Sequence, residues 1–300
     1  MKYSIELIRL LAVILITLTH TRHSLTQEST LTYFLAEQLP TIGTVLLSIV
    51  SGYLYRKVSF DKPKLFFNKV KTLLIPFLIA NLLVLTLVLA ANYIFDINFL
   101  NRLSFDSSLL TEGVLALNSP PINPPTYFIR DIFMIFVLME FVRNRNLYML
   151  LIIIPLLVFG KLLLRYDILL LFLLGMAIAH YEVFLNPLKT KLMICVVLVL
   201  LSVILIAQTD VTVYKYPIAL LIFILAINWK VKFYNVGSYS YLLHLYHSPI
   251  IVATYPVIEN ITENDFLSVL IQVSISFAVV YLLYRLTRKV VALRVLCGYK

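Results

Sequence analysis

Ten long apolar runs constrain the fold of this chain more than any other feature of its sequence. They occupy residues 5–23, 39–57, 73–95, 126–142, 147–160, 166–183, 192–208, 213–228, 237–257 and 266–288. An α-helix crosses a bilayer core about 30 Å thick with roughly 20 mostly apolar residues. The hydrophobic share of 61% is also more than a water-soluble chain of this length can bury. The runs therefore predict an all-α, polytopic integral membrane bundle of about ten transmembrane helices.

The distribution of the 25 Lys and Arg residues predicts the orientation of these helices. With ten helices and the N-terminus inside, 18 of these residues fall on the cytoplasmic side and five on the opposite side. Those on the cytoplasmic side are Lys2, Arg56, Lys57, Lys62, Lys64, Lys69, Lys71, Arg143, Arg145, Lys189, Lys191, Lys230, Lys232, Arg285, Arg288, Lys289, Arg294 and Lys300. Cytoplasmic loops of membrane proteins carry such an excess of positive charge. We therefore expect both termini in the cytoplasm.

The remaining composition indicates one membrane domain over residues 1–300, with no separate soluble domain. The net charge of +10 is scattered in short clusters between apolar runs, which is typical of orientation signals and not of a nucleic-acid partner. The sequence has no CxxC pair and no Gly-rich phosphate loop. The predicted topology separates Cys195 from Cys297, so a disulfide framework is not expected. We expect the chain to lie in the lipid bilayer, to bind no metal, and to hold no permanently bound cofactor.

The first apolar run carries ionisable residues that are costly inside a membrane and therefore mark a candidate site. Arg9 and His20 are eleven positions apart, which returns to within about 20° of the same helix face and spans roughly 16 Å. Glu6 lies close to the same stripe. A polar stripe on an apolar helix faces protein or water, not lipid. The alternative is that Arg9 extends to the inner headgroups and His20 lies in the outer interface.

A second candidate segment is residues 237–250, in which His244 and His247 share one helix face. Pro249 is predicted to bend or break this helix close to His247. A histidine takes up and returns a proton near neutral pH, which suits a catalytic role. The alternative is a pair of packed, hydrogen-bonded helix histidines. A zinc site formed by His20, His23, His244 and His247 is a further alternative, because i,i+3 histidine pairs are weakly specific.

Two further segments carry candidate binding residues. Arg130 and Asp131 begin the fourth apolar run, where Arg130 either holds an anionic or polar group or lies in the membrane interface. Lys69 and Lys71 end a basic stretch beside the third run. Such a stretch suits anionic lipid headgroups or the phosphates of coenzyme A, or it is an orientation signal alone.

Several short motifs in the same order resemble the acyltransferase-3 family, the multi-pass acyltransferases that modify bacterial surface and exported glycans. The motifs are Arg9 with His20, Ser51-Gly52-Tyr53, Lys69 and Lys71 before Leu74-Ile75-Pro76, Tyr127 to Asp131, Phe172 to Gly175, and His247-Ser248-Pro249. The resemblance runs the full length of the chain. Two positions depart from the family pattern. Lysines stand at 69 and 71 where arginines are common, and His244 stands where an aromatic residue is usual.

The resemblance implies transfer of an acyl group, usually acetyl, from cytoplasmic acetyl-CoA or another acyl-CoA to a glycan hydroxyl. The acceptor would be a cell-surface or lipid-linked glycan, such as lipopolysaccharide O-antigen, exopolysaccharide or capsule. It also implies a multi-pass enzyme of the bacterial cytoplasmic (inner) membrane, with glycan-assembly proteins as possible partners. Because the sequence ends soon after the tenth apolar run, we expect no extracytoplasmic esterase-like domain of the kind that some members carry, and we expect the membrane domain itself to complete the transfer.

The same resemblance suggests roles for the candidate residues. His20 is the general base, or a transient acyl carrier, for the acceptor hydroxyl. Arg9 positions the donor or stabilises charge, with Glu6 on the same stripe. Lys69 and Lys71 attract the phosphates of coenzyme A. The pocket is also expected to be lined by Arg130, Asp131 and a late histidine, either His244 or His247.

Two other functional classes remain as alternatives. A transporter of a small molecule or a lipid-linked sugar would explain the polar stripe without catalysis, and it predicts inverted repeats, which the sequence does not show. A structural partner of a glycan-export complex predicts that none of the buried ionisable residues matters for activity.

Overall fold

The structure is a computed structural model that describes residues 3–23, 37–62, 64–98, 100, 102–182, 187–208, 212–227, 229 and 231–298. Within these residues the chain forms helices joined by loops and has no strand. Lys2, Lys230 and Lys300, which entered the charge count, lie outside the described residues.

Each predicted run overlaps a helix of the structure. The α-helices are α1 (Tyr3–Leu18), α3 (Ile42–Leu54), α4 (Leu65–Lys69), α5 (Ile75–Phe95), α6 (Tyr127–Asn144), α7 (Leu150–Phe159), α8 (Tyr166–His180), α10 (Leu188–Gln208), α11 (Lys215–Ala226), α12 (Gly237–Glu259) and α13 (Asp265–Lys289). Short 3-10 helices are η3 (Leu39–Thr41), η7 (Pro124–Thr126), η8 (Leu147–Met149), η9 (Thr212–Tyr214) and η10 (Val291–Cys297). Turns of π-helix are η4 (Tyr55–Ser59), η5 (Val70–Leu74) and η6 (Leu109–Val114).

Among the described residues, three helical stretches are long and apolar enough to cross a membrane on length and composition alone. They are Leu65–Phe95, Leu188–Ile206 and Asp265–Lys289. Only 11% of the most apolar part of Leu188–Ile206 is buried, so most of its Leu, Val and Ile side chains point away from the protein. Such a surface is unfavourable in water and favourable against lipid tails. The number of crossings and the side of the termini stay predictions.

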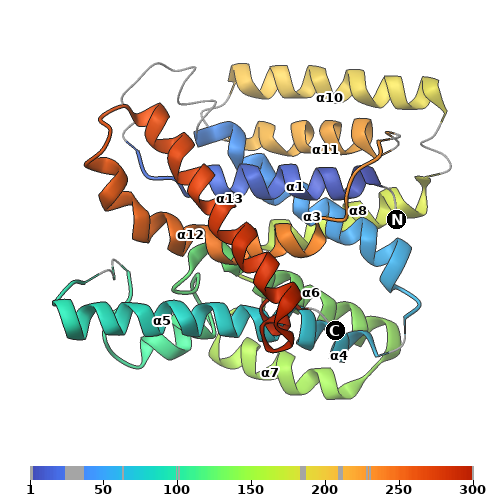
Figure 1. The fold of residues 1–300 in the computed structure, drawn as a ribbon. Helices are drawn as coiled ribbons and strands as arrows, with labels where there is room; N and C mark the ends of the chain where they lie inside the picture. Colours follow the sequence, from blue (N-terminus) through green and yellow to red (C-terminus); the bar gives the residue numbers. More distant parts are fainter. Residues whose placement is uncertain are drawn as a thin grey trace.

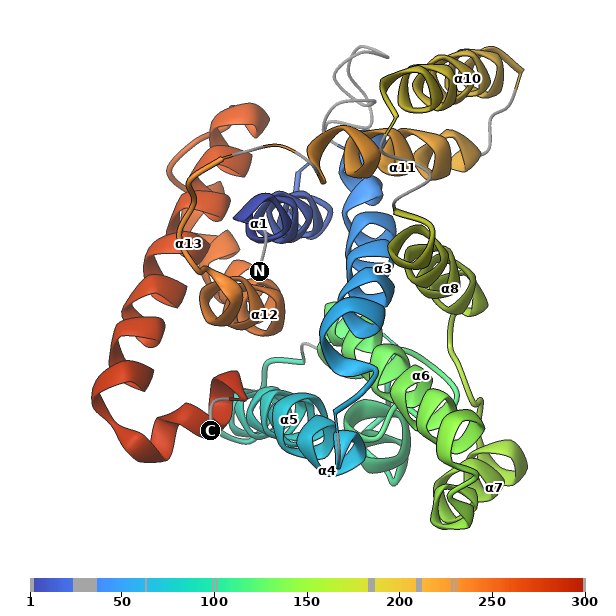
Figure 2. The same ribbon diagram turned by 90° about the vertical axis from the view of Figure 1, so that its right-hand side faces the viewer.

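Helix α1 lies in the middle of one part of the bundle. It contacts α3, α11, α12 and α13, which surround it in end-on view (Figure 2). Helices α1, α5, α10 and α11 run close to a common axis, and α13 crosses them at an angle (Figure 1). The largest apolar core joins buried side chains of α1, α3, α6, α8, α11 and α12. The most polar of the apolar runs therefore lies inside protein and not against lipid, as its charged residues require.

Helices α3 and α8 pack with their backbones in contact through two glycines. A Cβ atom on Gly52 would lie 1.8 Å from the Phe172 carbonyl oxygen, and one on Gly175 would lie 2.1 Å from the Ile49 carbonyl oxygen. Each helix thus presents its glycine to the backbone of the other. Small residues permit this close approach, which is a main source of helix association in membranes. The two glycines belong to the Ser51-Gly52-Tyr53 and Phe172 to Gly175 motifs, so both motifs serve packing here.

Candidate functional site

The structure contains a cavity of about 300 Å³ that includes Arg9 and His244 in its lining. We call it the Arg9 cavity. Its walls are mostly apolar side chains of α1, α3 and α6, and Arg9 and Lys69 are its two basic lining residues apart from His244. The remaining polar lining residues are Ser51, Tyr55, Ser59, Ser240 and Tyr241. The cavity adjoins the segments that we predict to be cytoplasmic.

A second cavity of about 390 Å³ includes His20 in its lining and is called the His20 cavity. Its other polar lining residues are Arg22, Arg102, Asn123 and Ser248. It adjoins residues 96–125, the loop that we predict to lie on the outer side. The two cavities share no lining residue.

Arg9 is held in place by a buried carboxylate and a glycine. Its Nη1 atom lies 3.2 Å from Oε1 of Glu6, whose side chain is 3% exposed. On the other side is Gly237, where an added Cβ would lie 3.0 Å from Nη1 of Arg9. Because α12 begins at this glycine, the guanidinium packs directly against the backbone of that helix. Glu6 and Arg9, which the sequence places close to one helix stripe, form an ion pair at the edge of the cavity.

The two candidate lysines lie in different surroundings. Lys69 lines the Arg9 cavity, and its Nζ atom lies 3.9 Å from the centroid of the Phe136 ring, which is a cation–π contact. Lys71 is exposed and lines neither of the two cavities. The structure therefore brings Lys69, but not Lys71, into the same cavity as Arg9.

His20 lies beyond the end of the first helix and not within it. Helix α1 ends at Leu18, and the backbone N–H of His20 donates to the Thr17 carbonyl oxygen at 3.2 Å in a turn. The predicted helix over residues 5–23 is therefore too long at its C-terminal end. Arg9 and His20 still face the same neighbour, because Arg9 contacts Gly237 and the ring centroids of His20 and His247 are 5.3 Å apart. These two contacts also show that α1 and α12 run parallel.

His244 and His247 lie on α12 with ring centroids 6.2 Å apart. Both are buried, with exposed fractions of 4% for His244 and 0% for His247. His244 lines the Arg9 cavity and packs edge-on against Phe128. His247 packs against His20, which lines the second cavity. The three histidines thus form a continuous row from one cavity to the other.

Helix α12 continues through Pro249, although the sequence predicted a bend or break there. Proline leaves the carbonyl four residues earlier, that of Leu245, without its usual helical donor. The side-chain amide of Asn123 donates to this carbonyl at 2.7 Å. Asn123 is itself held by Asn81, whose Oδ1 accepts from the Asn123 backbone N–H at 3.2 Å. Because both asparagines are uncharged, the sequence-based selection of ionisable residues missed them. The one sequence feature that could have drawn attention to Asn123 is its position directly before Pro124.

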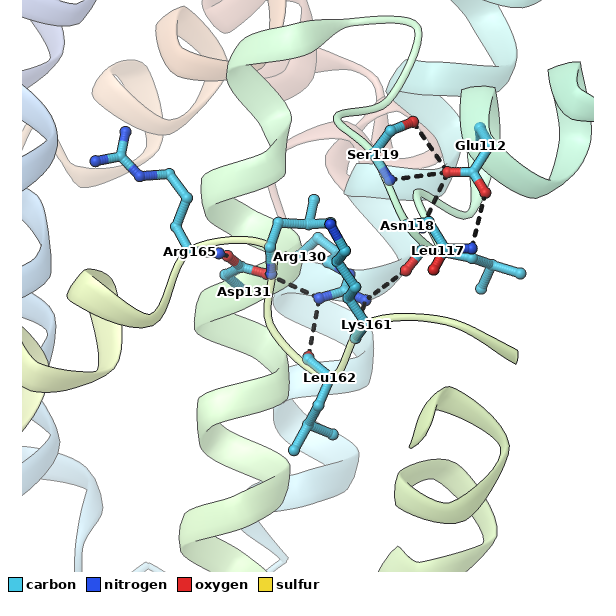
Figure 3. Close-up of polar contacts among 10 residues, drawn as sticks. Glu112, Leu117, Asn118, Ser119, Arg130, Asp131, Lys161, Leu162 and Arg165 are labelled. Carbon is cyan, nitrogen blue, oxygen red and sulfur yellow. Dashed lines mark hydrogen bonds and ion pairs between the residues drawn. The ribbon is translucent and has the colours of Figure 1, made fainter. Parts of the chain in front are cut away.

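Arg130 and Asp131 join two loops and line neither cavity. Arg130 donates to the carbonyl oxygens of Leu162, at 2.9 Å, and of Lys161, and also pairs with Asp131 at 2.9 Å (Figure 3). Asp131 accepts the backbone N–H groups of Leu164 at 3.0 Å and of Arg165 at 2.8 Å. These contacts use both terminal nitrogens of Arg130 and both carboxylate oxygens of Asp131, and they fix residues 161–165 against the start of α6. The structure thus places both residues away from any donor-binding position in the two cavities.

We expect Asp131→Ala to destabilise the protein by about 3–5 kcal/mol, because it leaves the buried Arg130 guanidinium without its partner. The pair is almost fully enclosed, with exposed side-chain fractions of 5% for Arg130 and 0% for Asp131. The midpoint of thermal unfolding in detergent measures this loss. Asp61→Ala is the matched control at an exposed aspartate and should leave the midpoint nearly unchanged. Equal midpoints for the two variants would contradict the role given to Asp131.

The loop beside the His20 cavity is ordered by Glu112 and Arg102. Glu112 accepts the backbone N–H groups of Asn118 and Ser119, each at 2.9 Å. Partial burial alone would raise the pKa of Glu112, but these hydrogen bonds outweigh it and lower the pKa. Arg102 donates to Ser119 Oγ at 2.7 Å and to the Pro120 carbonyl oxygen. The ionised carboxylate therefore keeps this part of the cavity wall in place at neutral pH.

The described residues contain no group of three or more His, Cys, Asp or Glu side chains arranged to hold a metal ion. The row of His20, His247 and His244 is therefore extended from cavity to cavity and not gathered around a point.

Comparison with known protein families identifies a family for most of the chain. A family model described as "Acyltransferase domain", that of the acyltransferase-3 family, matches residues 2–285. Comparisons with curated proteins and with solved structures each give no match.

Proposed function

The chain belongs to the acyltransferase-3 family and is therefore a membrane acyltransferase; from this premise we propose that it moves an acetyl group from cytoplasmic acetyl-CoA to a hydroxyl of a cell-surface or lipid-linked glycan. The observation that supports this proposal most is the row of three histidines between two separate cavities. The Arg9 cavity combines Arg9 and Lys69 with mostly apolar walls, and the His20 cavity combines the candidate base with Arg22, Arg102, Asn123 and Ser248.

The Arg9 cavity suits the thioester donor. Arg9 and Lys69 attract the phosphate groups of coenzyme A, and the apolar walls accept the acyl end. Lys69 is desolvated against Phe136, which strengthens its interaction with an anion that also enters the cavity. Lys71 contributes only to the field at the cavity entrance, because it lies outside the lining.

The His20 cavity suits the sugar acceptor. Asn123 and Ser248 offer neutral hydrogen-bonding groups, which match sugar hydroxyls, and His20 lies in the same wall. His20 takes the proton from the attacking hydroxyl, and Arg9 holds the donor in place. We place the enzyme in the bacterial inner membrane, where the donor and the acceptor are available on opposite sides. The transporter alternative predicts inverted repeats, which the sequence does not show.

Acyl esters on the glycans of the native host test this function. We expect a gene-deletion strain to lose alkali-labile O-acetyl esters, and the wild-type gene to restore them, as measured by proton NMR of purified surface glycan. His180→Phe serves as a control variant, because His180 is exposed on α8 and lines neither cavity. Unchanged esters in the deletion strain, together with no label transfer from radioactive acetyl-CoA to host membranes by the purified protein, would refute the proposal.

A further inference from the structure

His244 borders one of the two cavities and is one of three histidines in a row between them. It lines the Arg9 cavity, whereas His20 lines the other cavity. His247 is fully buried and lies between them, with ring centroids 5.3 Å from His20 and 6.2 Å from His244. An aromatic residue at position 244 would fill the same space against Phe128 but would have no nitrogen to offer the cavity.

The ring nitrogens in this row are largely unpaired. Nδ1 of His247 lies 2.7 Å from the Leu243 carbonyl oxygen, so it carries a proton, and Nε2 has no hydrogen-bond partner among the described residues. The Pro125 carbonyl lies near the His244 ring, but no hydrogen bond of ordinary geometry joins any described residue to either nitrogen. Buried polar atoms are nearly always paired, and an unpaired one requires an explanation.

Proton balance in the proposed reaction gives that explanation. The hydroxyl oxygen of the acceptor attacks the thioester carbonyl, a C–O bond forms, the C–S bond breaks, and the products are an ester and a thiol. Because the oxygen and the sulfur are bonded to the same carbon in the transition state, the acetyl end of the donor has to reach the wall between the two cavities. There the hydroxyl loses its proton beside His20, and the departing sulfur takes up a proton beside His244. A thiolate leaves more readily when a general acid protonates it in the transition state.

We propose that His244 is the general acid that protonates the departing thiolate, with His247 passing on the proton that His20 takes from the acceptor hydroxyl. This inference rests on the proposed acyl transfer and assigns a residue and a direction to its proton movement. His247 receives and releases the proton at Nε2, since Nδ1 is held by Leu243. His244 has both nitrogens available, so it accepts a proton on one and gives the sulfur a proton from the other. No net proton is gained or lost.

Two acetyl donors with different leaving groups test the role of His244. S-acetyl-N-acetylcysteamine releases an alkyl thiolate that needs a proton, whereas S-(4-nitrophenyl) thioacetate releases a stabilised aryl thiolate that does not. Octyl β-D-glucoside serves as the acceptor probe. For His244→Phe we expect the rate with the alkyl donor to fall at least about 100-fold, and the rate with the aryl donor to fall less than about tenfold. His20→Ala should lose both activities alike, because the acceptor base is needed with either donor.

Equal losses with both donors in His244→Phe would mean that His244 has only a structural role, and the inference would be wrong. A wild-type protein that transfers acetyl from neither these donors nor acetyl-CoA would refute the proposed function itself.

Added imidazole provides a second test that uses acetyl-CoA directly. In His244→Ala the ring is replaced by space beside the Arg9 cavity, which imidazole is small enough to enter. We expect added imidazole to raise the transfer rate of His244→Ala at least about tenfold, and to leave the rates of wild type and His180→Phe unchanged. Absence of rescue in a folded variant that still binds acetyl-CoA would overturn the inference.

Discussion

His20→Ala is expected to lower the rate of acyl transfer about 100- to 10,000-fold, because general base catalysis by a positioned histidine contributes this range. At about 1.36 kcal/mol per tenfold change, this corresponds to roughly 3–5 kcal/mol of transition-state stabilisation. The measurement is the initial rate of acetyl transfer by purified protein at matched concentration, together with the glycan esters in the complemented deletion strain.

The same substitution should leave folding almost intact. His20 lies beyond the end of α1, and it is its backbone N–H, not its ring, that bonds to Thr17. Alanine retains that N–H. His180→Ala is the matched control, and both variants should elute as wild type in size-exclusion chromatography. Activity of His20→Ala equal to that of wild type would exclude His20 as base and as acyl carrier.

The second large effect is expected at the contact between α3 and α8. Gly52→Ala should prevent formation of the native bundle, because the added Cβ would lie 1.8 Å from the Phe172 carbonyl oxygen. Both partners are backbone segments of packed helices, so relief requires the helices to separate. Separation would also disturb the Gly175 contact, and the combined loss belongs to the rare class above about 4 kcal/mol.

Gly113→Ala is the control for this prediction. A Cβ atom there would first meet Leu103 Cδ1 at 3.3 Å, which is the end of a flexible side chain. We expect Gly113→Ala to be purified as a monodisperse protein with a nearly unchanged melting temperature, and Gly52→Ala to aggregate or be degraded in the membrane. A stable, monodisperse Gly52→Ala would show that α3 and α8 have more freedom than the structure indicates.

The family and the general class of activity followed from short motifs, and the match over residues 2–285 confirms the family. Each apolar run also appears as a helix, because helical hydrogen bonds inside a segment need no partner from elsewhere in the chain. The helix ends were less predictable. The end of α1 at Leu18 and the passage of α12 through Pro249 depend on neighbours, such as the Asn123 amide that pairs with the Leu245 carbonyl.

The candidate site residues were likewise only partly predictable from the sequence. The chemistry of Arg9, His20, His244 and His247 was evident from the cost of ionisable groups in apolar runs, and that of Lys69 from its basic stretch beside the third run. The structure gathers these five around two cavities. Arg130 and Asp131 satisfied the same criterion, yet their partners are backbone groups of residues 161–165. A buried charge requires a partner, but sequence alone does not say whether that partner is a substrate or a loop.

The sequence by itself determined the helical segments, the expected membrane setting, the family and the identity of the ionisable groups, because these depend on local composition and short spacing. Only the tertiary structure decided which of those groups meet. The row from His20 through His247 to His244 joins residues more than 200 positions apart, and it exists because α1 and α12 pack in parallel. Such contacts arise from the packing of whole helices, where a glycine such as Gly52 or Gly237 sets how closely two backbones approach.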